Sequence, residues 1–357
     1  MKIIIVLLVT IVSVAAANGQ SQAKKVLFLG NSYTSYNNLP QIIADVATSM
    51  GDTLEWDIEA PGGWWLYDHS ISAASINKIE AGNWDYVVLQ DQSQAMTLPD
   101  SQIALGISSI QKLDSIINEY NPCAETMFYM TWGRKNGDSL FYQVYSPWYE
   151  EPTYQFMDSL IHERYMQMSI LNNAEVSPVG AVWKYIRQNN PGIELYQSDE
   201  SHPSLAGSYL AACSFYTTLF RKDPTLISFN SSLSITDATT IKNAVKLIIY
   251  DSLVNWNIGI YDSLNNIACI TANLNTIDES QSSLQQIFPN PATSILTLKI
   301  DDGNDKEQIQ IYNSSGLLIH EIEGLTTTQI DIKELANGLY FIRLKNHPGK
   351  TLKFIKN

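Results

Sequence analysis

Apolar and polar positions divide the first two thirds of the chain into two kinds of segment. Val26–Leu29 and Tyr86–Leu89 are apolar at every position, whereas Ile103–Tyr120 places its apolar residues at helical spacing. Strands that are apolar on both faces are typical of a parallel sheet covered by helices on each side, so an α/β fold is predicted. Further strands are expected at Leu54–Ile58, Met127–Thr131 and Val176–Val179, and further helices at Pro40–Met50, Phe156–Leu171, Ser204–Phe220 and Ile241–Trp256.

The pattern changes near residue 270. Ile270–Gln286 is polar, rich in Ser, Asn and Gln, and has no sustained period, which indicates a linker. Beyond it, short β-type runs alternate with turn residues, which predicts a small all-β sandwich over residues 287–357. The α/β domain then covers residues 24–269. The expected strands of the tail are Ile295–Ile300, Gln308–Tyr312, Leu317–His320, Thr328–Ile332, Leu339–Leu344 and Thr351–Ile355.

The chain begins with a segment that is typical of a secretory signal peptide. Lys2 precedes an apolar run from Ile3 to Val14, and three alanines follow before the polar Asn18. The run is shorter than the roughly 20 apolar residues that a membrane span needs. Residues 1–17 are therefore predicted to direct export, and the protein is not expected to be an integral membrane protein.

Charge narrows the range of partners. The chain has 22 Lys and Arg against 36 Asp and Glu, a net charge of −14. Residues 283–357 contain eight of each sign, so the acidic excess belongs to the front domain. An acidic surface repels phosphate polymers, so no nucleic-acid partner is expected.

Three cysteines, Cys123, Cys213 and Cys269, lie far apart in the chain. An odd number leaves at least one thiol unpaired, and a framework of several disulfides is not expected. Cys213 lies in an apolar helical pattern and is interpreted as a small buried residue. No Cys or His pair has metal-ligand spacing, so no metal site is predicted.

In doubly wound sheets, sites form in the loops beyond the carboxyl ends of the strands. The first such loop, Gly30-Asn31-Ser32, places a hydroxyl at a strand-to-helix turn where backbone N–H groups are free to bind an oxyanion. A serine nucleophile needs a base. His202 stands immediately before a helix, and Asp199, three residues earlier, can fold back to hold the imidazole. The alternative is that Asp199 only caps the helix and His202 is exposed.

Together these segments resemble the SGNH (GDSL-type) hydrolase superfamily. Gly30-Asn31-Ser32 stands where the first block of the family has Gly-Asp-Ser, and Asp199-x-x-His202 stands where the last block has acid and base. The resemblance covers residues 24–220. It implies a flavodoxin-like three-layer α/β/α sandwich, Ser32 as nucleophile, and no cofactor. Ala60-Pro61-Gly62-Gly63 matches the second block, which implies that Gly62 or Gly63, with Ser32, donates an N–H to the oxyanion.

The third block of the family departs from the usual pattern. The family normally has an Asn after the central strand, but here Tyr86–Leu89 runs into Gln90-Asp91-Gln92. Gln carries the same terminal amide one methylene further out and can donate to an oxyanion. Gln90 is the preferred third donor because it is the first polar residue beyond the strand, and Gln92 is the alternative.

The expected substrate is an acylated carbohydrate or another small ester, and the acyl group removed is expected to be acetyl. Trp64 follows the oxyanion glycines, while Trp132 and Arg134 follow the strand Met127–Thr131. These three residues are possible substrate contacts, since sugar rings stack on aromatic side chains, although the tryptophans could instead pack loops. No apolar lid for long acyl chains is evident. The alternatives are a lipase or acyl-thioesterase of the same fold, and a surface carbohydrate-binding protein without catalysis.

The tail has a resemblance of its own. Phe288-Pro289-Asn290-Pro291, Asn337-Gly338-Leu339-Tyr340 and the closing Lys353–Lys356 look like the C-terminal sorting domain of the type IX secretion system of Bacteroidetes. This resemblance implies that the secretion machinery is a partner and that the protein is secreted or held at the outer cell surface. The alternative is a carbohydrate-binding β module.

Overall fold

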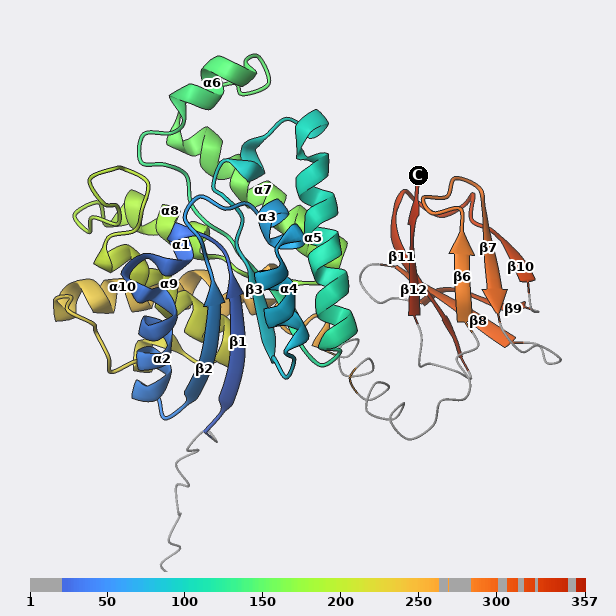
Figure 1. The fold of residues 1–357 in the computed structure, drawn as a ribbon, viewed down its shortest axis with the longest axis horizontal. Helices are drawn as coiled ribbons and strands as arrows, with labels where there is room; N and C mark the ends of the chain where they lie inside the picture. Colours follow the sequence, from blue (N-terminus) through green and yellow to red (C-terminus); the bar gives the residue numbers. More distant parts are fainter. Residues whose placement is uncertain are drawn as a thin grey trace, which may run out of the picture.

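The computed structural model describes residues 21–262, 269, 284–300, 307–313, 318–324, 327–345 and 351–357. The predicted signal peptide and most of the predicted linker lie outside these described residues. The front domain is built on one five-stranded parallel sheet with the strand order β2-β1-β3-β4-β5 (Figure 1). The strands are β1 Ala23–Leu29, β2 Thr53–Glu59, β3 Tyr86–Leu89, β4 Glu125–Tyr129 and β5 Glu175–Ser177.

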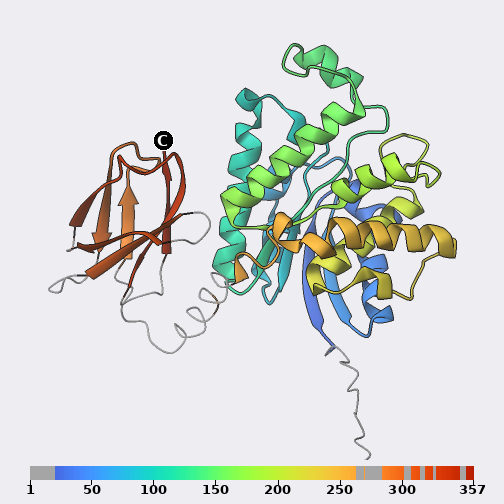
Figure 2. The ribbon, with the colours of Figure 1, turned by 180° about the vertical axis from the view of Figure 1, so that it is seen from behind.

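The central strands are buried on both faces, as their composition predicts. Val26 through Leu29 have no exposed surface, and every residue of β3 is buried. Helices α2, α8, α9 and α10 pack together as one layer, and α3, α4, α5 and α7 pack together as another (Figures 1 and 2). The predicted α/β class with a covered parallel sheet is thus confirmed. Among the helices that the structure describes, none has the length and apolar character to span a membrane.

The helices of the front domain follow each strand in turn. They are α1 Ser32–Ser35, α2 Leu39–Ser49, α3 Leu66–Ile71, α4 Ala73–Glu80, α5 Asp100–Tyr120, α6 Ser139–Tyr145, α7 Tyr154–Asn172, α8 Val179–Asn189, α9 Leu205–Phe220 and α10 Ile235–Ile248. Short 3₁₀ segments are η1 Tyr36–Asn38, η2 Ala95–Thr97, η3 Pro224–Leu226 and η4 Tyr250–Trp256.

Several predicted boundaries are wrong, among them that of the strand Met127–Thr131, which ends at Tyr129, and two others have local reasons. The expected strand Val176–Val179 ends at Ser177, because Pro178 lacks an N–H and precedes helix α8, which the prediction missed. The expected helix Ile241–Trp256 starts earlier, at Ile235, and gives way after Ile248 to η4, inside which Ser252 has non-helical backbone angles.

The tail consists of two antiparallel sheets with the orders β10-β7-β6 and β12-β11-β8-β9. Its core contains Leu296, Leu298, Ile309, Ile311 and Ile342, none of which has exposed surface. The first strand begins at Leu284, inside the segment predicted as linker. The strands are β6 Leu284–Phe288, β7 Ile295–Ile300, β8 Glu307–Asn313, β9 Leu318–Gly324, β10 Thr327–Asp331, β11 Gly338–Leu344 and β12 Thr351–Lys356.

A disulfide joins Cys123 to Cys269 across 146 residues of sequence. Cys123 lies in the turn before β4, so the bond ties the end of the front domain back to its sheet. Cys213 is a free, fully buried thiol on α9, in agreement with its interpretation as a buried residue.

Candidate active site

The turn after β1 presents Ser32 at the carboxyl edge of the sheet. Asn31 is the N-cap of α1, and its side-chain oxygen accepts the N–H of Tyr33 at 3.1 Å. Ser32 is the first helical residue and is partly exposed. Gly30 precedes the cap at a position where a Cβ atom would collide with the side chains of Thr34 and Gln90, so only glycine fits there.

The structure brings Ser32, His202 and Asp199 together. His202 Nε2 lies 2.8 Å from Ser32 Oγ, and His202 Nδ1 lies 2.5 Å from Asp199 Oδ2. A carboxylate only accepts hydrogen bonds, so Nδ1 carries the proton and Nε2 is left to accept the Ser32 hydroxyl. Asp199 Oδ1 also accepts the N–H of His202 at 3.0 Å, which fixes the loop.

Burial acts to raise the pKa of Asp199, but hydrogen bonds from the His202 ring and from the N–H groups of Ser201 and His202 outweigh it and lower the pKa. Asp199 therefore remains a carboxylate at neutral pH. Its side chain is 46% exposed and that of His202 is 27% exposed, so water reaches both. Tyr36 stacks on the His202 ring with centroids 4.7 Å apart, which limits its rotation.

The predicted oxyanion donors lie on two exposed turns. Within the described residues, no hydrogen bond occupies the N–H groups of Ser32, Gly62 or Gly63. The loop that contains Gly62 and Gly63 (the glycine loop, residues 60–65) is anchored to the turn Gly30–Ser32 (the nucleophile turn). Asn31 Nδ2 donates to the carbonyl of Trp64 at 2.9 Å. Gly63 has a φ of +76°, the left-handed conformation that glycine adopts without strain.

The two glutamines that could complete an oxyanion hole are both held by neighbours. Gln90 is fully buried, and its Nε2 donates to Asn31 Oδ1 at 3.0 Å and to the carbonyl of Asp91 at 2.5 Å. Gln92 Nε2 donates to Gln94 Oε1 at 3.0 Å. Gln90 thus holds the nucleophile turn in position, and the choice of a third donor stays a prediction.

The three predicted substrate contacts lie in different surroundings. Trp132 is fully buried between Tyr33 and Trp183, with ring centroids at 4.8 and 3.7 Å, so its predicted contact with substrate is not supported and its role is packing. Trp64 is partly exposed. Arg134 keeps a third of its side chain exposed and donates to Gln94 Oε1 at 3.1 Å.

His69 is a functional neighbour that sequence reasoning missed. It is fully buried under the nucleophile turn, with Nε2 2.8 Å from the carbonyl of Gly30 and Nδ1 2.8 Å from Ser75 Oγ. A carbonyl only accepts, so Nε2 carries the proton and Nδ1 accepts from Ser75. Burial lowers the pKa of His69, which keeps the ring neutral and suited to bracing Gly30. The helical spacing of Leu66, His69 and Ser70, all buried in α3, was the sequence signal that could have indicated a buried histidine.

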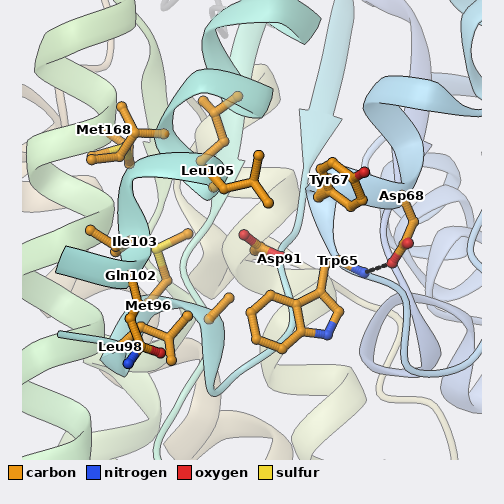
Figure 3. Close-up of a pocket in the computed structure, with 14 residues that line it drawn as sticks. Trp65, Tyr67, Asp68, Asp91, Met96, Leu98, Gln102, Ile103, Leu105 and Met168 are labelled. Carbon is orange, nitrogen blue, oxygen red and sulfur yellow. Dashed lines mark hydrogen bonds between the residues drawn. The ribbon is translucent and has the colours of Figure 1, made fainter. Parts of the chain in front are cut away.

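An apolar pocket of about 310 Å³ lies between α3, α5 and α7 (Figure 3). Trp65 forms one wall, and the carboxyl group of Asp91 points into the pocket from the loop after β3. Burial raises the pKa of Asp91 to about 6. The remaining wall is contributed mainly by Met96, Leu98, Ile103, Leu105 and Met168.

The best candidate for a cation among the described residues lies at the opposite edge of the sheet. Oxygen atoms of Glu125, Glu175 and Asp262 fall within 4.8 Å of one another. Arg221 already pairs with Glu175 at 2.9 Å and with Asp262 at 2.5 Å, so the cluster has its own counter-charge. The absence of a metal site stays a prediction.

Comparison with known proteins addresses the two parts of the chain separately. Residues 286–357 match the family described as "Secretion system C-terminal sorting domain". No curated protein shows significant similarity to the chain. A solved structure of a DUF4886 family protein from Bacteroides uniformis shares 17% sequence identity at a TM-score of 0.53, covering 65% of this chain and 95% of that chain. This likeness shows the fold of the front domain.

Other solved structures carry names from the predicted superfamily. A protein of Slackia heliotrinireducens, provisionally named an SGNH hydrolase, shares 26% identity at a TM-score of 0.46, covering 55% of this chain and 99% of that chain. A lipase/acylhydrolase of Enterococcus faecalis shares 16% sequence identity at a TM-score of 0.39, covering 55% of this chain and 95% of that chain. The family match over residues 286–357 agrees with the predicted resemblance of the tail, and the likeness to the DUF4886 family structure confirms the predicted α/β fold of the front domain. The resemblance of the front domain to the SGNH superfamily stays a prediction.

Proposed function

We propose that the protein is a secreted serine ester hydrolase. The observation that carries this proposal is the 2.8 Å approach of His202 Nε2 to Ser32 Oγ, with Asp199 on the other ring nitrogen. A nucleophile, a base within hydrogen-bond reach and a third group that orients the base are the parts that acyl transfer needs. A protein that only binds carbohydrate has no need of all three.

In the proposed mechanism His202 accepts the Ser32 proton as Oγ attacks the ester carbonyl, and Asp199 stabilises the imidazolium that forms. The N–H groups of Ser32 and of Gly62 or Gly63 hold the negative charge on the carbonyl oxygen. His202 then gives its proton to the leaving alcohol, and water hydrolyses the acyl-enzyme by the same steps. The loss of one oxyanion donor in such a site typically costs about 2.7–4 kcal/mol of transition-state stabilisation.

The proposed substrate is an acetylated carbohydrate. Ser32 is partly exposed, the exposed ring of Tyr36 stacks on His202, and Arg134, from the loop after β4, keeps a third of its side chain exposed. Aromatic faces and polar donors around an open site suit sugar rings. The sorting-domain match over residues 286–357 supports the proposal that type IX secretion delivers the enzyme to the cell surface or beyond.

A second candidate substrate is an ester with a longer acyl chain. The apolar pocket of about 310 Å³ adjoins Trp65, two residues beyond Gly63, and its walls could hold such a chain. Rates on p-nitrophenyl esters from acetyl to octanoyl separate the two candidates. A fall in kcat/KM with each added methylene favours acetyl, and a rise favours the longer chain.

Ser32→Ala tests the function itself. We expect the purified wild-type chain to hydrolyse p-nitrophenyl acetate and to release acetate from acetylated xylan or pectin, and the variant to retain less than a thousandth of either rate. Full activity in Ser32→Ala would refute the nucleophile, and an inactive wild type across all esters would favour the binding-protein alternative.

A further inference from the structure

Asp91 connects two loops that flank the nucleophile turn. Its Oδ1 accepts the N–H of Leu66 at 2.9 Å and that of Gln92 at 2.8 Å, and the residue is 1% exposed. Leu66 is the first residue of α3 and directly follows the glycine loop. Asp91 itself is held in place, since its N–H donates to Tyr165 Oη of α7 at 3.2 Å.

The hydrogen bond to Leu66 satisfies an N–H group that helix α3 cannot pair from within, because the first N–H groups of a helix have no partner inside it. Trp65 is the N-cap of α3, and its own N–H donates to Asp68 Oδ2 of the first turn at 2.8 Å. This local contact leaves the N–H of Leu66, at the first helical position, without a partner on α3. Asp91 supplies an acceptor from a different loop, so it fixes where α3 begins relative to β3.

This arrangement anchors the glycine loop at two points. Asn31 Nδ2 holds the carbonyl of Trp64, and Asp91 holds the N–H of Leu66, so the chain on both sides of Trp65 is fixed to the ends of β1 and β3. Adjacent Cα atoms are about 3.8 Å apart, so Gly63 lies one residue from the first anchor and three from the second. The direction of the Gly63 N–H therefore depends on both hydrogen bonds, the one at Trp64 and the one at Leu66.

We propose that Asp91 is a positioning residue that aims the backbone N–H groups of the glycine loop at the developing oxyanion. This inference rests on the proposed function. The contribution comes from the acceptor oxygen rather than from charge, because the hydrogen bonds are made to two neutral N–H groups in a buried site. An uncharged side chain of the same shape with the same oxygen will therefore preserve it, and a side chain without an acceptor will not.

The test compares Asp91→Ala and Asp91→Asn with a matched variant at Asp114. Asp114 is also a buried carboxylate with two hydrogen-bond donors, Thr126 and Asn118, but it lies on α5 outside the site. Steady-state kcat and KM for p-nitrophenyl acetate are measured well below the melting temperature of each variant. We expect Asp91→Ala to lower kcat about 10- to 100-fold with KM nearly unchanged, because a displaced donor acts on the transition state.

Asp91→Asn is expected to keep kcat within about threefold of the wild type, and Asp114→Ala to lose thermal stability but not kcat. If Asp91→Ala does not fold, Asp91→Val takes its place, because it also lacks an acceptor but fills the buried space, and it must lower kcat in the same way. An unchanged kcat in the variant that folds, an Asp91→Asn as impaired as Asp91→Ala, or an equal loss in Asp114→Ala overturns the inference. A wild type inactive on every ester overturns the proposed function and this inference together.

Discussion

Gly62 and Gly63 are neighbours in one exposed loop, but only Gly63 has a backbone conformation that favours glycine. Neither would bring a Cβ within 4 Å of another group, but Gly63 has a φ of +76° and Gly62 is not in the left-handed region. An L-residue in that region costs roughly 1–2 kcal/mol. The strain at Gly63 would be relieved by turning the peptide groups on either side of it.

We therefore expect Gly63→Ala to lower kcat on p-nitrophenyl acetate by about tenfold or more, because the loop relaxes away from the oxyanion position. Gly62→Ala, which keeps its N–H and meets no neighbour, should stay within about twofold. Steady-state kinetics of the two variants side by side check this. Equal effects would show that backbone conformation in this loop does not matter to turnover.

The residues of the predicted triad could be found from the sequence, but the hydrogen-bond partners of the surrounding side chains could not. Ser32, Asp199 and His202 stand in segments whose type and order suffice to bring them together. The amide of Gln90 faces Asn31 because the missing side chain of Gly30 leaves room for it, and that depends on atoms 60 residues apart. The packing of side chains from distant segments therefore decides which glutamine amide faces an oxyanion, and the sequence pattern does not show it.

At the level of elements, a column of aromatic rings links α1 to α8. Tyr33 stacks on Trp132 from the loop after β4, Trp132 stacks on Trp183 of α8, and Tyr196 meets Trp183 edge-on at 5.0 Å. The sequence analysis predicted no helix at α8, although Val179, Val182 and Ile186 have helical spacing and are buried. The stacking of the rings could not be predicted from the sequence, because the rings come from separate elements.

Trp183→Ala should lower the free energy of unfolding by about 3–5 kcal/mol, since it empties a fully buried site against Trp132. Gln188→Ala, at an exposed position on the same helix, should change it by less than about 0.5 kcal/mol. Urea unfolding followed by tryptophan fluorescence and by circular dichroism measures both. A loss below 1 kcal/mol in Trp183→Ala would mean that the column does not support the domain.

Across the whole molecule, buried carboxyl groups make stability depend on pH. Burial raises the pKa of Asp114 to about 6, and the hydrogen bond from Thr126, the positive charge of Lys353 and the hydrogen bond from Asn118 offset only part of that rise. Between about pH 4 and pH 6 the folded state therefore keeps on Asp114 a proton that the unfolded state has lost, so the contribution of Asp114 to stability falls as pH rises through this window and is constant above it. A shift of this size corresponds to roughly 3 kcal/mol.

Asp114→Asn should remove this part of the pH dependence, so that its stability relative to the wild type rises between pH 4 and pH 6. Glu119→Gln, at an exposed position of the same helix α5, should leave the curve as it is. Urea midpoints at half-unit steps of pH provide the measurement. Parallel curves for Asp114→Asn and the wild type would contradict the assignment.

The disulfide between Cys123 and Cys269 leaves the whole tail outside the cross-linked part of the front domain. It closes a loop that contains most of the front domain, and opening it should cost about 2–4 kcal/mol of stability. Every residue after 269 lies outside that closed loop. A protease that cuts between residues 270 and 283 would therefore free the β-sandwich while leaving the cross-link intact, and the product should keep the thermal stability of the uncut front domain until a reductant is added. If the separated front domain melts at the same temperature with and without dithiothreitol, the disulfide does not stabilise it.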